Sequence, residues 1–180
     1  MNHESALTGF LAVVLNTTSI GKNVRHLIER KDEPYCFRLQ GQRVYYVSER
    51  IVASAHLLPR DNIIGLGTCV GKFTHSYKFH VKITFLDFMA PYAKYKVWVK
   101  PSQELSFLYG NNIIKSGLAR ITENTPQYQG VIVFSINDLP LGFGVTARST
   151  AQCRVIDSSE VVVLREADIG EYLREESQLY

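Results

Sequence analysis

Two neighbouring segments of the chain carry basic side chains in patterns that suit contact with a polyanion. The first is Lys94–Lys100, KYKVWVK, in which apolar and basic residues alternate with the period of a β-strand. One face of this strand would carry Trp98 beside three lysines, Lys94, Lys96 and Lys100. Ammonium groups attract phosphates irrespective of base sequence, and an indole ring offers a base a stacking surface. This face therefore indicates contact with single-stranded RNA.

The same pattern also has an ordinary structural interpretation. Half-exposed strands of many domains direct lysines to solvent, and a lone tryptophan such as Trp98 is more often part of a core than a stacking platform. The strand pattern alone leaves both interpretations open.

The second basic segment is the turn Tyr109–Arg120, YGNNIIKSGLAR. Its two glycines, Gly110 and Gly117, can adopt positive φ, so the backbone can reverse twice within a few residues. The apolar pair between the glycines can anchor the turn inward, which leaves Lys115 and Arg120 to face solvent. The segment predicts a turn that presents positive charge.

Other kinds of chemistry find less support. The segment Ile63–Phe73, IIGLGTCVGKF, lacks the glycine and the hydroxyl residue of a P-loop, because Leu66 and Phe73 stand in their places, and Val70 replaces the third glycine of a dinucleotide fingerprint. The five histidines show no metal-ligand spacing, so we expect no metal site and no cofactor. Cys69 has no charged base beside it in sequence and is expected to be a buried thiol.

Composition places the chain among folded proteins with one large or two small domains. It has 180 residues, of which 46% are hydrophobic and 21% charged, which excludes disorder as the main state. Residues 1–92 carry 11 basic and 7 acidic side chains, residues 93–154 carry 7 and 3, and residues 155–180 carry 2 and 7. A mildly basic chain with an acidic final segment suits contact with a polyanion over part of its surface.

Targeting signals and cysteine usage bear on the compartment. Three widely spaced cysteines predict neither a disulfide framework nor a structural zinc site, so we expect a reducing compartment. The apolar run Leu7–Leu15 is too short to cross a bilayer and lacks the flanks of a signal peptide. We expect neither secretion nor membrane association.

The first half of the chain alternates helical and strand patterns. Two β-rich runs, Tyr35–Leu39 and Arg43–Val47, are separated by three polar residues and predict a hairpin. A strand is predicted from Phe79 to near Asp87. The helical patterns comprise a stripe at Ile20, Val24, Leu27 and Ile28, and a helix from Ser48 to about Leu58 with Ile51, Val52 and Ala55 as its buried side.

The second half contains closely spaced short strands. A helix is predicted from Ser102 to Leu108, with Gly110 at its C-terminal end. We expect a final helix, capped by Asp168, with an apolar stripe of Ile169, Tyr172 and Leu173. The predicted strands, whose spacing is typical of a small barrel, are Leu118–Thr122, Val131–Ser135, Gly142–Ala147 and Val161–Leu164.

Pro91 lies where these two patterns meet and predicts a domain junction. The expected fold class is α+β: an N-terminal α/β domain with an antiparallel sheet and helices in residues 1–92, then a small β-barrel in residues 93–180.

Several motifs resemble known sequences. The order of strand, helix, YGNNIIKSGL turn and PLGFGVTARST resembles the PUA domain, a small RNA-binding barrel. Motifs along about residues 20–180 together resemble the Nip-seven family of 60S ribosomal subunit biogenesis proteins. They are YCFRL, RVYYVSE, LGTCVGKFT, APYAKYKVW, SFLYGN, ITENTPQYQGVIVF, PLGFGV and ADIGEYLR, which begin at Tyr35, Arg43, Leu66, Ala90, Ser106, Ile121, Pro140 and Ala167. Residues 2–18 depart from that family, whose members begin with a charged amphipathic helix.

The resemblance implies a non-enzymatic, monomeric factor of the nucleus and nucleolus. Its N-terminal domain would contact ribosome assembly proteins of the pre-60S particle, and its PUA-type barrel would bind precursor rRNA. On a basic PUA surface, the candidate RNA contacts are Lys100, Lys115, Arg120, Arg148 and Arg154. Gly142 and Gly144 are expected to permit close packing rather than to touch RNA.

Two other functions stay open. PUA domains also occur in RNA-modifying enzymes, but Asp87 lacks the neighbours of a synthase aspartate and 92 residues are few for such a catalytic domain. A pure protein adaptor is the other possibility, and RNA binding by the C-terminal half would distinguish it from an RNA-binding factor.

Overall fold

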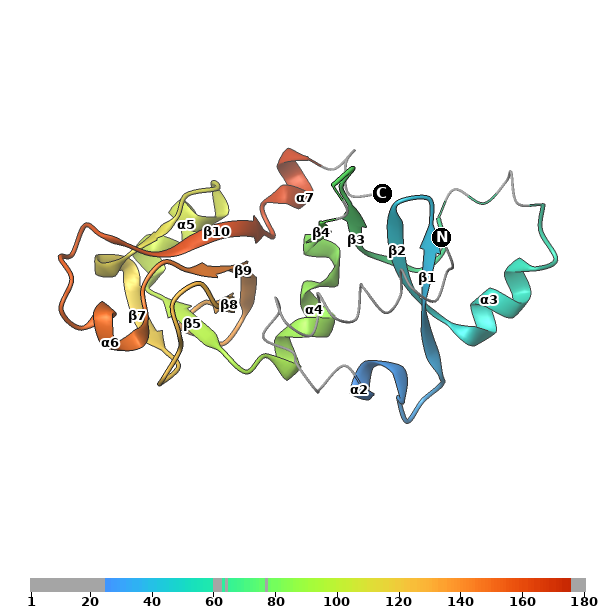
Figure 1. The fold of residues 1–180 in the computed structure, drawn as a ribbon, viewed down its shortest axis with the longest axis horizontal. Coiled ribbons are helices and arrows are strands. Elements are labelled where there is room, and N and C mark those ends of the chain that lie inside the picture. Colours follow the sequence, from blue (N-terminus) through green and yellow to red (C-terminus); the bar gives the residue numbers. More distant parts are fainter. Residues whose placement is uncertain (1–24, 60–62, 64, 77, 176–180) are drawn as a thin grey trace.

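Two β-sheets linked by short helices make up the fold, which the computed structural model describes for residues 25–59, 63, 65–76 and 78–175 (Figure 1). The first sheet has the order β1-β2-β3-β4 and is antiparallel throughout. Its strands are β1 (Tyr35–Gln40), β2 (Arg43–Ser48), β3 (Thr68–Phe73) and β4 (Phe79–Val81). The predicted hairpin is confirmed, with Gly41 at φ +61° in its turn.

Helix α3 (Glu49–Ala55) begins where the sequence predicts, because the Ser48 hydroxyl accepts a hydrogen bond from the Ile51 N–H. The predicted buried side of this helix is wrong. None of its residues is buried, and Ile51 is 48% exposed. The helix projects away from the sheet (Figure 1), so no second layer covers its apolar stripe within the described part of the chain.

The strand predicted from Phe79 to near Asp87 ends early. The Lys82 N–H makes a last bond to the Val70 carbonyl, and helical turns then follow. These turns are η3 (Ile83–Phe85), α4 (Leu86–Met89) and η4 (Ala90–Tyr92). Consecutive Phe85 and Leu86 are both buried, which a strand could not achieve because its side chains alternate between two faces. Burial in the core therefore determines the helical turns here, against the alternating pattern of the sequence.

The second sheet has the order β6-β10-β9-β8-β5-β7. Its two outer strands are joined by one helical turn, η5 (Lys115–Gly117), so the sheet curls into a nearly closed barrel. All its pairs are antiparallel except that of β5 with β8. The strands are β5 (Lys96–Val99), β6 (Ile113–Ile114), β7 (Leu118–Ile121), β8 (Gly130–Phe134), β9 (Pro140–Thr146) and β10 (Val161–Asp168).

Glycines fit the barrel in two ways. Helix α5 (Pro101–Leu108) ends as predicted, with Gly110 at φ +94° just after it. Gly117 does not have positive φ; it lies against Gln103, whose Cγ would be 2.6 Å from an added Cβ. At Gly142 an added Cβ would lie 2.8 Å from the Asp168 Cα, which confirms the packing role expected there.

The C-terminal helix differs from expectation. Helix α7 (Glu171–Arg174) is capped by Gly170, whereas Asp168 is the last residue of β10 and is fully buried. Leu173 is 91% and Tyr172 41% exposed, so of the predicted apolar stripe Ile169 alone packs against the core clusters that the structure describes. Asp168 instead accepts a hydrogen bond from the Gly170 N–H.

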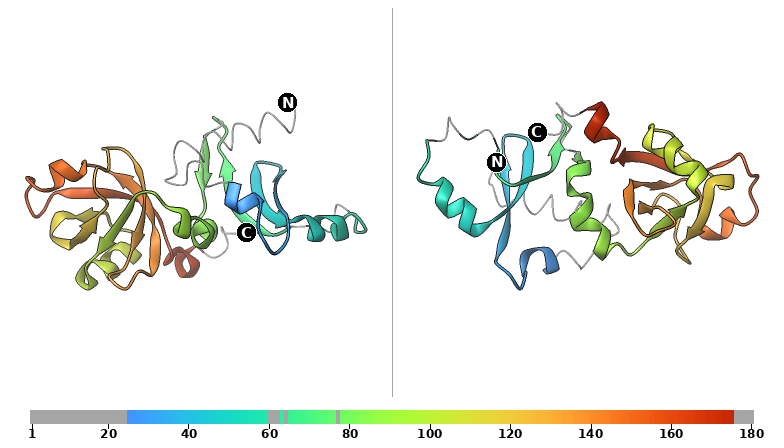
Figure 2. Two further views of the ribbon diagram at one scale, coloured as in Figure 1. Left: turned by 90° about the horizontal axis from the view of Figure 1, so that it is seen from below. Right: turned by 180° about the vertical axis from the view of Figure 1, so that it is seen from behind.

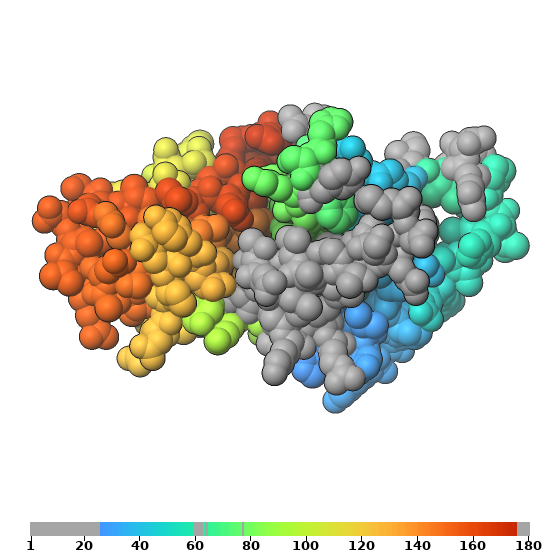
Figure 3. Space-filling model, in the orientation of Figure 1, coloured from blue at the N-terminus to red at the C-terminus, as the bar shows by residue number. Residues whose placement is uncertain are grey.

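Two hydrophobic clusters hold the elements together. One lies inside the barrel and includes Val97, Val133 and Val162, none of them measurably exposed. The other joins the first sheet and α4 to the outside of the barrel, where Phe134 and Phe143 belong to the same cluster. The barrel and the first sheet lie side by side along the longest axis, with α4 between them in all three views (Figures 1 and 2). In the space-filling view β1 and α3 lie far from the barrel strands (Figure 3).

The predicted residues Ile20 and Val24, and the departure from the family in residues 2–18, lie outside the described residues. Leu27 is buried in α2 (Arg25–Ile28), whereas Ile28 is 37% exposed.

Candidate nucleic-acid interface

Four of the five predicted RNA contacts gather at one end of the barrel. Lys100 directly precedes α5, and its ammonium group donates a 2.7 Å hydrogen bond to the Ser116 carbonyl in η5. Lys115 begins η5 and its N–H donates to the Glu160 carbonyl just before β10. The turn that links the outer strands therefore contains Lys115 and binds the ammonium group of Lys100.

Arg148 joins the same end through an ion pair. Its guanidinium lies 3.0 Å from the Glu160 carboxylate, whose backbone binds Lys115. Both partners are about two-fifths exposed, so this pair adds little to stability. It does partly neutralise the basic surface. The pair was not predicted, because the two residues lie twelve positions apart, Arg148 after β9 and Glu160 before β10.

Helix α6 (Thr150–Cys153) carries the fourth basic residue. A reciprocal capping box between Ser149 and Gln152 fixes its start. Arg154 follows its last residue and is exposed. Its position at a helix C-terminus also has a structural value, since a cation there interacts favourably with the helix dipole.

The thiol of Cys153 lies beneath these cations. It is buried, and burial raises its pKa, while the charges of Lys115 and Arg148 lower it in part. Burial also raises the pKa of the Cys69 thiol, as expected for a thiol without a catalytic base. Neither thiol has the low pKa that a nucleophile needs.

Arg120 lies apart from the other four. It projects from β7 over the ring of Trp98, 4.2 Å from the ring centroid, and its guanidinium is 4.0 Å from the Asp138 carboxylate. On the opposite neighbouring strand, Phe134 stacks against Trp98 with a centroid distance of 5.9 Å. Arg120 and Phe134 therefore cover the Trp98 ring from its two sides, and the ring packs against the cluster shared with the first sheet. It offers no free face on which a base could stack.

A buried charge network that the sequence analysis did not identify supports the opposite end of β10. Asp168 accepts hydrogen bonds from Arg165 at 2.5 Å and from Arg174 at 2.9 Å. Arg165 also binds Glu171, and Arg174 donates to the Leu108 carbonyl at the end of α5. The signal was available, because charges of opposite sign recur at intervals of three residues and six residues from Arg165 to Arg174.

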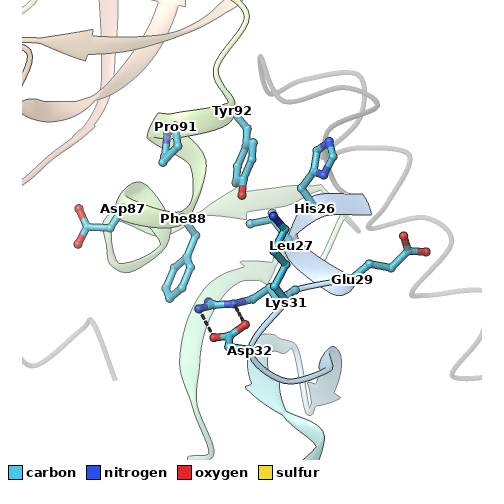
Figure 4. A pocket seen from close by; sticks show the side chains of 10 residues that line it. His26, Leu27, Glu29, Lys31, Asp32, Asp87, Phe88, Pro91 and Tyr92 are labelled. Carbon is cyan, nitrogen blue, oxygen red and sulfur yellow. Dashed lines mark hydrogen bonds and ion pairs between the residues drawn. The ribbon is translucent and has the colours of Figure 1, made fainter.

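A pocket of about 420 Å³ lies between α2 and α4 (Figure 4). His26 and Tyr92 stack on one side of it, and the Arg30 guanidinium lies 2.6 Å from the Asp32 carboxylate. This ion pair lowers the pKa of Asp32. Asp87 lies at the pocket's edge and points away from the other labelled side chains in Figure 4.

Among the residues that the structure describes, no three His, Cys, Asp or Glu side chains are placed to hold a metal ion. No helix in the same part of the chain is long and apolar enough to cross a membrane.

Comparison with family models matches both halves of the chain. Residues 4–83 match the NIP7/UPF0113 pre-PUA domain, and residues 95–177 match the UPF0113 PUA domain. Among solved structures, a conserved PUA domain protein from Thermoplasma acidophilum superposes with a TM-score of 0.57 at 11% identity, over 96% of this chain and 94% of that one. The expected fold class, with its PUA-type barrel, is confirmed.

Curated relatives agree over almost the whole length. A 60S ribosome subunit biogenesis protein NIP7 homolog from Xenopus tropicalis is 59% identical over 89% of each chain. One from Dictyostelium discoideum is 59% identical over 98% of this chain and 97% of its own. At this identity and coverage, the chain belongs to the NIP7 family.

Proposed function

We propose that this protein is a non-enzymatic factor in the biogenesis of the 60S ribosomal subunit. The observation that carries the proposal is 59% identity, over nearly the full length, to relatives named for that role. The PUA barrel supplies a basic end suited to RNA, built from Lys100, Lys115, Arg148 and Arg154. Its RNA partner is precursor rRNA, and its place of action is the nucleus and nucleolus.

The two halves of the chain have different binding roles in this proposal. Residues 1–92 form the module that docks an assembly protein of the pre-60S particle, and residues 93–180 form the RNA-binding module of a monomeric protein. Two modules that each bind modestly gain retention when they are tethered, because the second contact forms at a high effective concentration. Weak RNA binding by the barrel is then sufficient.

Three cations at the barrel end have no carboxylate within ion-pair distance in the described part of the chain: Lys100, Lys115 and Arg154. If each neutralises one phosphate, replacing all three by glutamine reduces the salt slope of single-stranded RNA affinity by roughly 2 log units per log unit of salt. Fluorescence anisotropy with a labelled oligouridylate at several salt concentrations measures this slope.

Arg50→Gln, on the exposed helix α3, is the matched control. An unchanged slope in the triple variant would remove these residues from the site, and Arg120→Gln tested alone decides whether the surface extends across β7.

Depletion of the protein tests the cellular role. We expect free 60S subunits to fall and large-subunit rRNA precursors to accumulate, with only partial rescue by the triple variant. Sucrose-gradient profiles and precursor hybridisation measure both. Unchanged 60S levels would refute the proposal. Asp87→Ala should rescue fully; if it abolished function while the protein stayed folded, RNA modification would become the better explanation.

A further inference from the structure

The first sheet carries a basic row that the barrel site does not include. Three of its residues are paired directly across neighbouring strands: Arg43 on β2 lies opposite Lys72 on β3, and Lys72 lies opposite His80 on β4. Gln40 on β1 pairs with Arg43 and extends the row to the sheet edge. Directly paired residues of antiparallel strands share one face, so these four side chains form a single line across the sheet.

This line lies on the face that points away from the shared core. Phe37, Val44 and Phe79 alternate with the row residues along their strands and belong to the core cluster. Arg38, two residues before Gln40, is on the same outer face and is exposed, as are Lys72 and His80. Arg43 is half-buried on this face, and its charge lowers the pKa of the Cys69 thiol against the larger effect of burial.

Nearby carboxylates neutralise little of the positive charge of this row. Like charges placed directly opposite on neighbouring strands repel, so the pairing of Arg43 with Lys72 works against folding. Neither side chain has a described carboxylate within ion-pair distance. At the His80 end, Glu166 lies close enough for the imidazole charge to lower the carboxyl pKa, although loss of hydration raises that pKa more.

We propose that this row, Arg43, Lys72 and His80 with flanking Arg38, is a second phosphate-binding surface that holds a single-stranded RNA segment on the N-terminal domain. Adjacent strands lie about 4.8 Å apart, so the cations form a line about 10 Å long across β2, β3 and β4. A flexible polyanion can follow such a line, and phosphate contacts require charge rather than an apolar pocket.

An acidic protein segment is the competing occupant, and the surroundings of the row favour RNA. Protein interfaces usually centre on exposed apolar or aromatic side chains. Among the described residues of β1, β2, β3 and β4, no large apolar side chain is exposed. The exposed apolar residues of this half of the molecule, such as Ile51 and Leu57, lie instead on and beyond α3.

The test uses the full chain and a fluorescein-labelled oligouridylate of about 12 nucleotides, within the range that one small domain covers. The double variant R43Q/K72Q should reduce the salt slope of binding by about 1.4, since each lost phosphate contact on a single strand contributes about 0.7. Arg50→Gln removes one charge from the same domain outside the row and should leave the slope unchanged. A slope equal to that of the parent protein in R43Q/K72Q would overturn the proposal.

A second variant separates binding from folding. K72E places a carboxylate opposite Arg43, so it should raise the melting temperature while weakening RNA affinity at least tenfold. A raised melting temperature with unchanged RNA affinity would overturn the proposal. A labelled poly-glutamate peptide tests the competing occupant. The proposal would also be overturned if this peptide bound the parent protein but not R43Q/K72Q, while both proteins bound RNA equally. The row would then recognise an acidic protein segment.

The row and the barrel can fail independently. If the triple variant at Lys100, Lys115 and Arg154 binds RNA normally while R43Q/K72Q does not, the row stands and the barrel proposal falls. The reverse result removes the row and leaves the proposed function intact. Combining both sets should add their slope reductions, because the two surfaces lie on different sheets.

Discussion

Replacing Asp168 by alanine is expected to lower the free energy of unfolding by about 3 kcal/mol. The carboxylate is fully buried and accepts hydrogen bonds from Arg165, Arg174 and the Gly170 N–H. Its removal leaves two partly buried guanidinium groups without their main partner, and breaking a buried ion pair in this way typically costs 3–5 kcal/mol. The lower end applies here because Arg165 keeps Glu171 and both arginines are partly exposed. Urea denaturation followed by circular dichroism measures the loss.

Asp168→Asn is the control for this prediction. The amide oxygen can keep the bond to the Gly170 N–H, but the amide NH2 is a donor and cannot accept from Arg165 as the carboxylate does. Most of the destabilisation seen with alanine should therefore remain. Equal stability of Asp168→Ala and the parent protein would show that the network has no role in holding α7 against β10.

Replacing Phe143 by alanine is expected to cost about 3–5 kcal/mol and to weaken the coupling between the two halves. Phe143 lies on β9, which contacts α4, and it belongs to the cluster that includes Phe85 and Met89. Truncating a buried phenylalanine removes apolar contact and leaves a cavity, here between the sheets. Calorimetry should resolve two unfolding transitions where the parent protein shows one.

Leu141→Ala provides the comparison within the same strand. Leu141 is buried in the barrel's own cluster, so its loss should destabilise the barrel without changing how the halves are joined. If both variants gave the same single transition, the shared cluster would not couple the halves.

Local signals predicted much of the fold. The turn at Gly41, the cap at Ser48 and the helix end at Gly110 each depend on residues a few positions apart, and the structure confirms all three. The helical turns from Ile83 to Met89 could not be predicted from alternation, because the core into which these residues pack comes from distant strands and from the barrel.

The site was less predictable than the fold. Residue type and turn position suggested the basic side chains near the Gly117 turn as RNA contacts. The pairing of Arg148 with Glu160 and the cover of Trp98 by Arg120 and Phe134 could not be predicted in this way, because they depend on strand order. Strand order is set by non-local pairing. The basic row on the first sheet was not predicted for the same reason. Arg43 and Lys72 are far apart in sequence and become neighbours only through strand pairing.

The strand order of the barrel also determines when it can assemble during translation. Strand β10 lies between β6 and β9, although it is the last of the six strands to be synthesised. A nascent chain that has not reached Val161 leaves β6 without its partner and the inner cluster open at Val162 and Val163. Contacts between distant segments form slowly and leave apolar surface open to aggregation until they do. The first sheet is complete by Val81, so it can fold earlier and await the barrel strands that cover its core.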